Sequence, residues 1–125
     1  MARFGRKSKR LLGECHPDLI KLFNVVVKEF DCSILEGKRS LDRQKELLAD
    51  KKTKTLKSKH IEGKAVDVAP YPIDFEDRDR FHYFGGYVLG IAKMLNIDVI
   101  WGGDWNNNKE TKDNSFDDLV HFELR

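Results

Sequence analysis

Two short segments of the chain contain side chains of the types that bind metal ions: SKHIEGKAVDVAP at residues 58–70 and DDLVHFEL at residues 117–124. In the first segment His60 and Asp67 lie seven positions apart, and the second segment contains His121. Neutral imidazole and carboxylate are good zinc ligands, and catalytic zinc sites commonly use three protein ligands and leave the fourth position to water. We therefore predict a zinc site (Zn2+) with His60, Asp67 and His121 as its ligands.

These ligands need elements that bring two distant segments together. In AVDVAP, residues 65–70, strand alternation would send the two valines to one face and Asp67 to the other. In LVHFEL, residues 119–124, the same alternation places His121 and Glu123 on the face opposite the apolar side chains. Pairing of these two strands in one sheet would bring Asp67 and His121 side by side.

The position of His60 and the roles of the remaining histidines follow from the surrounding sequence. His60 is expected at the end of a polar loop over residues 51–59, and Gly63 would let the chain turn between His60 and the strand. His16 and His82 are expected to be surface or packing residues. A His with an Asp seven positions later is common, so an ordinary hydrogen-bonded pair remains the alternative to a metal site.

A carboxylate beside the ligands would complete a hydrolytic site. Asp118 lies three residues before His121, where it would stand beside the metal without binding it. In that position it would take a proton from the metal-activated water and later hand it to the leaving amine. Asp117 is the close alternative for this role, and we prefer Asp118 on spacing.

The rest of the chain reads as a mixture of helices and short strands. Helices are expected over residues 16–30, 40–50 and 77–95, and strands over residues 32–37 and 97–101. In the second helix the expected buried contacts are Leu41, Leu47 and Leu48. Because no regular βαβ repeat appears, we predict an α+β domain with a small antiparallel sheet flanked by helices.

Composition bounds the class of protein. The 125 residues favour a single domain, and 40% hydrophobic with 35% charged residues suits a folded chain rather than a disordered one. No apolar run approaches the roughly 20 residues that span a bilayer, so no membrane insertion is expected. The N-terminal 13 residues are basic but lack the apolar stretch of a secretory signal, so we expect the protein to begin in the cytoplasm. This basic segment and the lysine-rich loop could bind an anionic polymer such as a cell wall. The simpler expectation is that the segment is a frayed tail and the loop is solvated.

The sequence resembles a known family. Ser58, His60, Gly63, Ala65 and Asp67 fit SxHxxGxAxD, and the closing DxxH of the second segment fits [DE]xxH. These are signatures of the D-alanyl-D-alanine-type (VanY-like) zinc metallopeptidases, and the chain looks most like the L-alanyl-D-glutamate peptidase endolysins of tailed phages. LEGKRSLDRQ, WGGDWN and the final HFEL extend the resemblance over roughly residues 14 to 125.

The resemblance implies a role for each matching residue. His60, Asp67 and His121 would be the zinc ligands and Asp118 the general base, then acid. Arg39 would be catalytic and substrate-binding, because its planar cation would face the oxyanion or a substrate carboxylate. Ser58 would hydrogen-bond near the substrate or a ligand. Finally, Trp101, Asp104 and Trp105 would shape the cleft wall, with at least one tryptophan serving packing instead.

The resemblance also implies an architecture and a setting. The fold would be the small α+β domain shared with lysostaphin-like peptidases and the hedgehog signalling domain. A basic N-terminal segment, residues 1–13, would precede a single zinc peptidase domain, residues 14–125. The substrate would be the peptidoglycan stem peptide, cut between L-alanine and D-glutamate. We expect a monomer that waits in the host cytoplasm until a holin opens the membrane.

Two rival functions stay open. The first keeps the zinc but makes the enzyme a D-Ala-D-Ala carboxypeptidase or dipeptidase. The second is a non-catalytic basic module that binds nucleic acid, in which the His and Asp residues are structural. Such a module would bind DNA or RNA in a salt-sensitive way and would need no metal. The sequence contains no helix-turn-helix or aromatic-basic RNA motif, so we expect no specific nucleic-acid partner.

Overall fold

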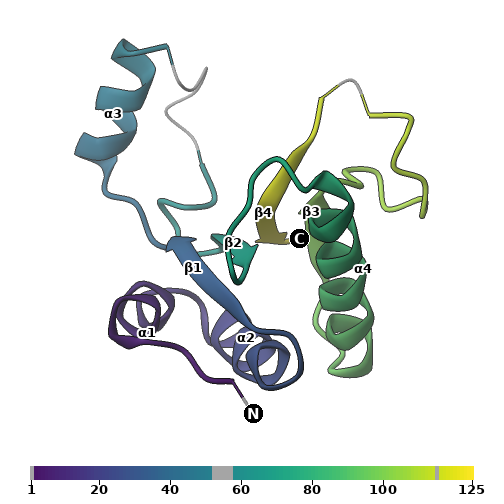
Figure 1. The fold of residues 1–125 in the computed structure, drawn as a ribbon. Helices are drawn as coiled ribbons and strands as arrows, with labels where there is room; N and C mark the ends of the chain where they lie inside the picture. The colour runs from purple at the N-terminus through teal and green to yellow at the C-terminus, as the bar shows by residue number, and fades with distance from the viewer. Residues whose placement is uncertain (1, 52–57, 115) are drawn as a thin grey trace.

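The computed structural model describes residues 2–51, 58–114 and 116–125, which form helices around one four-stranded sheet (Figure 1). The strands are β1 (Cys32–Glu36), β2 (Ala65–Pro70), β3 (Val99–Gly102) and β4 (Asp118–Leu124). The helices are α1 (Arg6–Gly13), α2 (Pro17–Glu29), α3 (Leu41–Ala49) and α4 (Arg78–Met94). This arrangement confirms the predicted α+β class.

The sheet has the strand order β1-β2-β4-β3, and every neighbouring pair is antiparallel. β2 and β4 are therefore the two central strands, although about fifty residues separate them in sequence. In their register Asp67 lies opposite His121. The predicted pairing of the segments that carry Asp67 and His121 is thus present, and the backbone ladder holds it in place.

One face of the sheet carries the hydrophobic core. Figure 1 shows α2 and α4 packed beside the sheet, and Phe122 of β4 meets Phe23 of α2 with ring centroids 5.4 Å apart. Val66, Val68 and Phe122 are fully buried. Each such burial contributes about 1.5–3 kcal/mol, and a one-residue slip would turn these side chains to the other face. The core therefore fixes the register that places Asp67 on the opposite face.

The N-terminal segment packs onto this core instead of fraying. Phe4 and Leu12 are 5% and 2% exposed, and the backbone N–H of Ile34 in β1 donates to Ser8 Oγ at 3.0 Å. The frayed tail expected for these residues is wrong, because the helix has an apolar side that β1 and α2 cover. A domain boundary between residues 13 and 14 stays a prediction.

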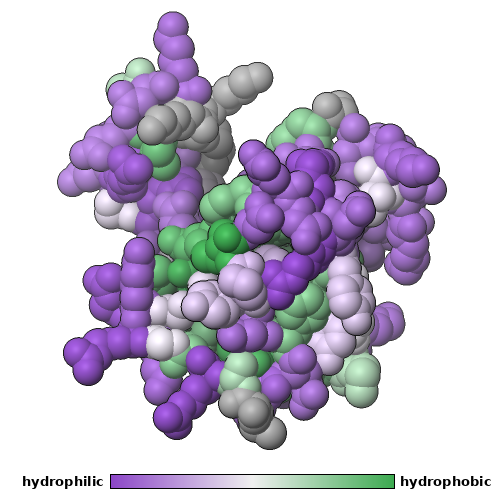
Figure 2. Space-filling model, viewed as in Figure 1, coloured by the Kyte–Doolittle hydropathy of each residue, from purple (hydrophilic) through white to green (hydrophobic). Residues whose placement is uncertain are grey.

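Residues 37–50, which we call the α3 arm, stand apart from the sheet (Figure 1), and their surface is largely hydrophilic (Figure 2). Ser40 caps α3 as predicted, with its Oγ accepting from the N–H of Arg43. The predicted buried leucines are wrong: Leu41 and Leu48 are 48% and 37% exposed, and Leu47 is half-buried. The buried residue is Gln44, because the inner side of this helix meets a polar side chain rather than the core.

Helix α4 contacts the sheet closely through one glycine. A Cβ at Gly85 would lie 2.3 Å from the ring of Trp101, so only glycine allows this approach. Trp101 is 3% exposed and its Nε1 donates to Leu119 O at 2.9 Å, which ties the start of β4 to the core. Within the described ranges no helix combines the length and apolarity required to cross a membrane.

Candidate metal centre

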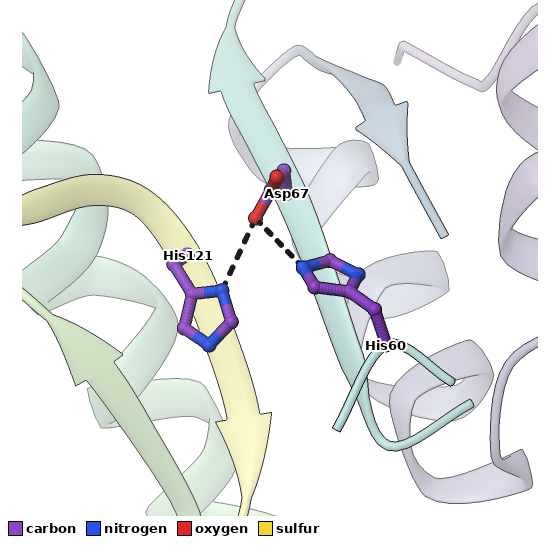
Figure 3. Close-up of side chains that lie close together, drawn as sticks. All are labelled: His60, Asp67 and His121. Carbon is purple, nitrogen blue, oxygen red and sulfur yellow. Dashed lines mark hydrogen bonds and ion pairs between the residues drawn. The ribbon is translucent and has the colours of Figure 1, made fainter. Parts of the chain in front are cut away.

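Three predicted ligands meet on the face of the sheet opposite the core (Figure 3). Oδ1 of Asp67 lies 3.3 Å from Nε2 of His60 and 3.3 Å from Nδ1 of His121. Asp67 and His121 come from β2 and β4, whereas His60 comes from the turn before β2. In that turn Gly63 has φ +71°, a left-handed conformation that favours glycine, as the sequence predicted.

The second nitrogen of each ring has a fixed partner. Nδ1 of His60 lies 2.8 Å from the carbonyl oxygen of Gly37, and Nε2 of His121 lies 2.8 Å from Oε1 of Glu123. A carbonyl and a carboxylate only accept hydrogen bonds, so these nitrogens carry the protons of the neutral rings. The lone pairs of both rings therefore point at a carboxylate oxygen of Asp67, an arrangement that needs a cation among the three atoms.

The two contacts of the Asp67 oxygen have the spacing of ligand atoms in a tetrahedral zinc site. The three ligand atoms all lie within 4.8 Å of one another, and both contacts of the carboxylate oxygen measure 3.3 Å. A tetrahedral zinc site with bonds of about 2.0–2.1 Å has ligand atoms about 3.3–3.4 Å apart. The set of two imidazoles and one carboxylate is also a common catalytic zinc set that leaves a fourth position for water.

The electrostatics of the three side chains favour a positive charge among them. Burial alone would raise the pKa of Asp67, but its interactions with His121 and His60 outweigh burial and hold that pKa well below its usual range. Burial alone would lower the pKa of His121, but hydrogen bonds to Asp67 and Glu123 outweigh burial and raise it to about 9. Asp67 and Glu123 therefore favour a positive charge at His121.

The two candidate bases, Asp117 and Asp118, have different surroundings in the structure. Asp117 Oδ2 accepts from the guanidinium of Arg78 at 2.6 Å, on the outer side of the molecule. Asp118 begins β4 and is half-buried, and burial together with the negative charge of Asp67 raises its pKa. The charges of Asp67, His121 and His60 all act on the pKa of Asp118, whereas Asp117 is paired with Arg78.

Arg39 and Ser58 both make contacts beside His60. The backbone N–H of Arg39 donates to His60 O at 2.8 Å, and Ser58 Oγ accepts from the N–H of His60 at 3.2 Å. The guanidinium of Arg39 makes a two-point ion pair with Glu36, at 2.7 and 2.8 Å, and donates to Gln44 Oε1 at 2.6 Å. Both partners lie in the LEGKRSLDRQ segment, but no pattern in the sequence assigned either of them a role.

The residues expected to shape the cleft wall divide into two roles. Trp101 packs inside the core, and Asp104 is 3% exposed with its carboxylate accepting from the N–H groups of Asn108 and Lys109. Trp105 instead borders the site, because its ring centroid lies 5.5 Å from that of His121. One tryptophan of the motif thus serves packing, as expected, and the other faces the ligands.

Comparison with known proteins places the chain among cell-wall peptidases. A model of the family described as phage L-alanyl-D-glutamate peptidase matches residues 1–125. The L-alanyl-D-glutamate peptidase of Escherichia phage T5 is 29% identical over 119 residues, which cover 89% of this chain and 87% of that protein.

Solved structures agree with this placement. ChiX, an L-Ala D-Glu endopeptidase of Serratia marcescens, matches with a TM-score of 0.79 and 28% identity over 99% of this chain and 91% of its own. The vancomycin-resistance D,D-pentapeptidase VanY, solved in complex with Zn(II), matches with a TM-score of 0.52 and 17% identity. The match covers 86% of this chain and 68% of the VanY chain. At that identity the VanY likeness shows the fold alone, and it is the fold that the motifs implied.

Proposed function

The chain belongs to the phage L-alanyl-D-glutamate peptidase family, and we propose that it uses zinc to hydrolyse the L-alanyl-D-glutamate bond of peptidoglycan stem peptides. Membership confirms the family indicated by the sequence motifs, and with it a peptidoglycan peptidase. The observation that carries the zinc proposal is the convergence of His60 Nε2, Asp67 Oδ1 and His121 Nδ1 on one point.

In this proposal zinc supplies Lewis acidity that polarises the scissile carbonyl and makes water a nucleophile near neutral pH. His60, Asp67 and His121 hold it on the open face of the sheet. Asp118 removes the proton of the attacking water and later protonates the amine of the departing D-glutamate. The raised pKa of Asp118 suits this exchange, because a carboxylate of ordinary pKa is a weaker base and gives up a proton too early.

Arg39 is proposed to face the oxyanion or a substrate carboxylate. A guanidinium has five N–H groups, and three of those of Arg39 are used by Glu36 and Gln44, so donors remain for a substrate oxygen. The contacts with Glu36 and Gln44 fix the orientation of the guanidinium before the substrate arrives, which avoids an ordering cost at the moment of reaction. Ser58 is proposed to act nearby, since its hydroxyl already orders the backbone at His60.

We propose that the protein acts on the cell wall after a holin releases it from the host cytoplasm. The substrate, a wall peptide, lies outside the membrane, so the enzyme and its target must be brought together. A monomer is sufficient for this proposal, because all three ligands and the base come from one chain.

Digestion of purified peptidoglycan tests the proposal. The protein is incubated with zinc, with a chelator, and with a chelator followed by added zinc, and the fragments are identified by mass spectrometry. We expect new L-alanine carboxyl ends and new D-glutamate amino ends with zinc, none with chelator, and recovery when zinc is restored. Release of terminal D-alanine alone would instead indicate a carboxypeptidase. An intact wall, with metal-independent and salt-sensitive binding to DNA or RNA, would favour the nucleic-acid-binding module.

A further inference from the structure

Glu123 makes a contact with the metal centre that no motif assigned. It lies two residues after His121 on β4, and therefore on the same face of the strand. Its Oε1 lies 2.8 Å from Nε2 of His121, and the two side chains are only 19% and 12% exposed. A carboxylate at this distance keeps the ring proton on Nε2 and leaves the lone pair of Nδ1 to face Asp67.

Lys59 connects Glu123 to the segment that carries the other imidazole. Its Nζ donates to the carbonyl oxygen of Leu124 at 2.6 Å and lies 3.8 Å from Oε2 of Glu123. Because Lys59 directly precedes His60, one side chain joins the turn that holds the first ligand to the strand that holds the third. The two oxygens of Glu123 thus have different partners, one on each segment.

Stability alone is a weak reason for these contacts. The Lys59 side chain is 35% exposed, and ion pairs at such positions contribute about 0–1 kcal/mol. The orientation of a ligand is a stronger reason. Without an acceptor at Nε2 the neutral ring of His121 can carry its proton on Nδ1, and that nitrogen then presents N–H to the cation. Partners of this kind change metal affinity or activity by about 10- to 100-fold in other proteins.

We propose that Glu123 is a positioning residue that selects Nδ1 of His121 as the metal-binding nitrogen, and that Lys59 fixes Glu123 relative to His60. The inference rests on the proposed zinc site and adds to it a pair of residues that sets ligand orientation. Glu123 touches neither the metal nor the substrate. Its effect is exerted through His121, so it is seen first in zinc binding and only then in turnover.

The test measures zinc affinity by competition with a chromogenic chelator for four single variants. Glu123→Ala is expected to weaken zinc binding by about 10- to 100-fold, whereas Glu123→Gln keeps most of the affinity, since its amide oxygen still accepts from Nε2. Lys59→Met is expected to weaken binding by about 3- to 10-fold. The matched control is Glu62→Gln, an exposed acid two residues after His60, for which we expect no change beyond about twofold.

A spectroscopic readout separates positioning from simple structural support. Ring 15N shifts of His121 in the zinc-loaded protein should show Nε2 protonated and Nδ1 bound in the wild type and in Glu123→Gln, and a changed pattern in Glu123→Ala. Zinc affinity of Glu123→Ala within about twofold of wild type, with unchanged ring shifts, overturns the inference and leaves the zinc site standing. If Glu123→Ala does not fold, unchanged affinity in Lys59→Met overturns it. A wild type that binds no zinc overturns the proposed function and this inference together.

Discussion

The β2–β4 pair and the α3 arm lie on either side of His60, but they are held in different ways. β2 and β4 are central strands joined by backbone hydrogen bonds, and side chains such as Val66 and Phe122 bury them against the core. The α3 arm stands clear of the sheet (Figure 1), and its one buried side chain, Gln44, is polar. Its contacts with the site are hydrogen bonds to His60, made by the backbone N–H of Arg39 and the carbonyl oxygen of Gly37.

This difference suggests a division of labour. Two of the proposed zinc ligands are on the central strands of the sheet, which suits a metal site because its donor atoms must be fixed to within a few tenths of an ångström. The arm carries a cation whose proposed partner is a substrate oxygen, a contact that tolerates adjustment. Substitutions at the site residues of the sheet should therefore abolish zinc binding or catalysis, whereas substitutions on the arm should only reduce activity.

The largest effect is expected for Asp67→Ala on β2. Asp67 Oδ1 is the atom that both imidazoles face, so its removal leaves two neutral ligands and no negative charge for the cation. We expect loss of zinc binding and of measurable peptidoglycan hydrolysis, with the helical and sheet content preserved. Chelator competition and circular dichroism check this. Retained turnover in the variant would break the assignment of the sheet side as the metal centre.

Asp118→Asn on β4 should separate catalysis from metal binding, because Asp118 is the proposed base and not a ligand. The amide cannot accept the proton of the attacking water, so kcat should fall by roughly 100- to 10,000-fold while zinc affinity remains near that of wild type. Asp117→Asn is the matched control, because Asp117 pairs with Arg78, and we expect its activity to stay within about threefold. The reverse pattern would transfer the role of base to Asp117.

Arg39→Lys probes the arm. Lysine keeps the charge but loses the two-point pair with Glu36, so the cation is no longer held in a fixed plane. We expect kcat/KM to fall by roughly 10- to 100-fold with zinc affinity unchanged. Arg43→Lys is the control, since Arg43 lies on the exposed side of the same arm. Equal activity in both variants would mean that Arg39 only supports the arm.

A smaller effect is expected in the pH dependence of the metal-free protein. The pKa of His121 is about 9 in the fold, above its ordinary value of 6.5, so its stabilisation is complete below about pH 6.5 and is lost as pH rises through about 9. The chelator-treated protein should therefore melt at a lower temperature at pH 9 than at pH 6.5, by at least about 3 °C. Thermal unfolding of His121→Asn should show a reduced difference; an equal difference would contradict the coupling.

The smallest effect is expected for the exposed leucines of the arm. Leu41→Ser and Leu48→Ser should each change the free energy of unfolding by less than about 0.5 kcal/mol, because both side chains already contact water. Leu22→Ala in α2, where the leucine is fully buried, should cost about 2–5 kcal/mol. Denaturant unfolding of the three variants compares arm and core. A large cost at either arm leucine would show that the arm is packed in solution.

Sequence patterns predicted the elements that follow a strict period. Asp67 stood between two valines and His121 between apolar residues, so alternation alone assigned the faces of β2 and β4. The same reasoning failed for Leu41, Leu47 and Leu48. A leucine is buried only where another element covers it, and the helical period of α3 does not show whether one does. The N-terminal helix was missed because the basic residues of this segment concealed its two core contacts, Leu12 in the helix and Phe4 just before it.

By itself, therefore, the sequence determined which three residues could bind a metal, which strands carry two of them, and the family to which the motifs belong. Only the tertiary structure decided that His60, Asp67 and His121 share one point, that Asp117 turns to Arg78, and that Glu123 meets His121. The physical reason is that periodicity reports which way a side chain leaves its own element. Which partners it meets depends on register and packing between segments that are far apart in the chain.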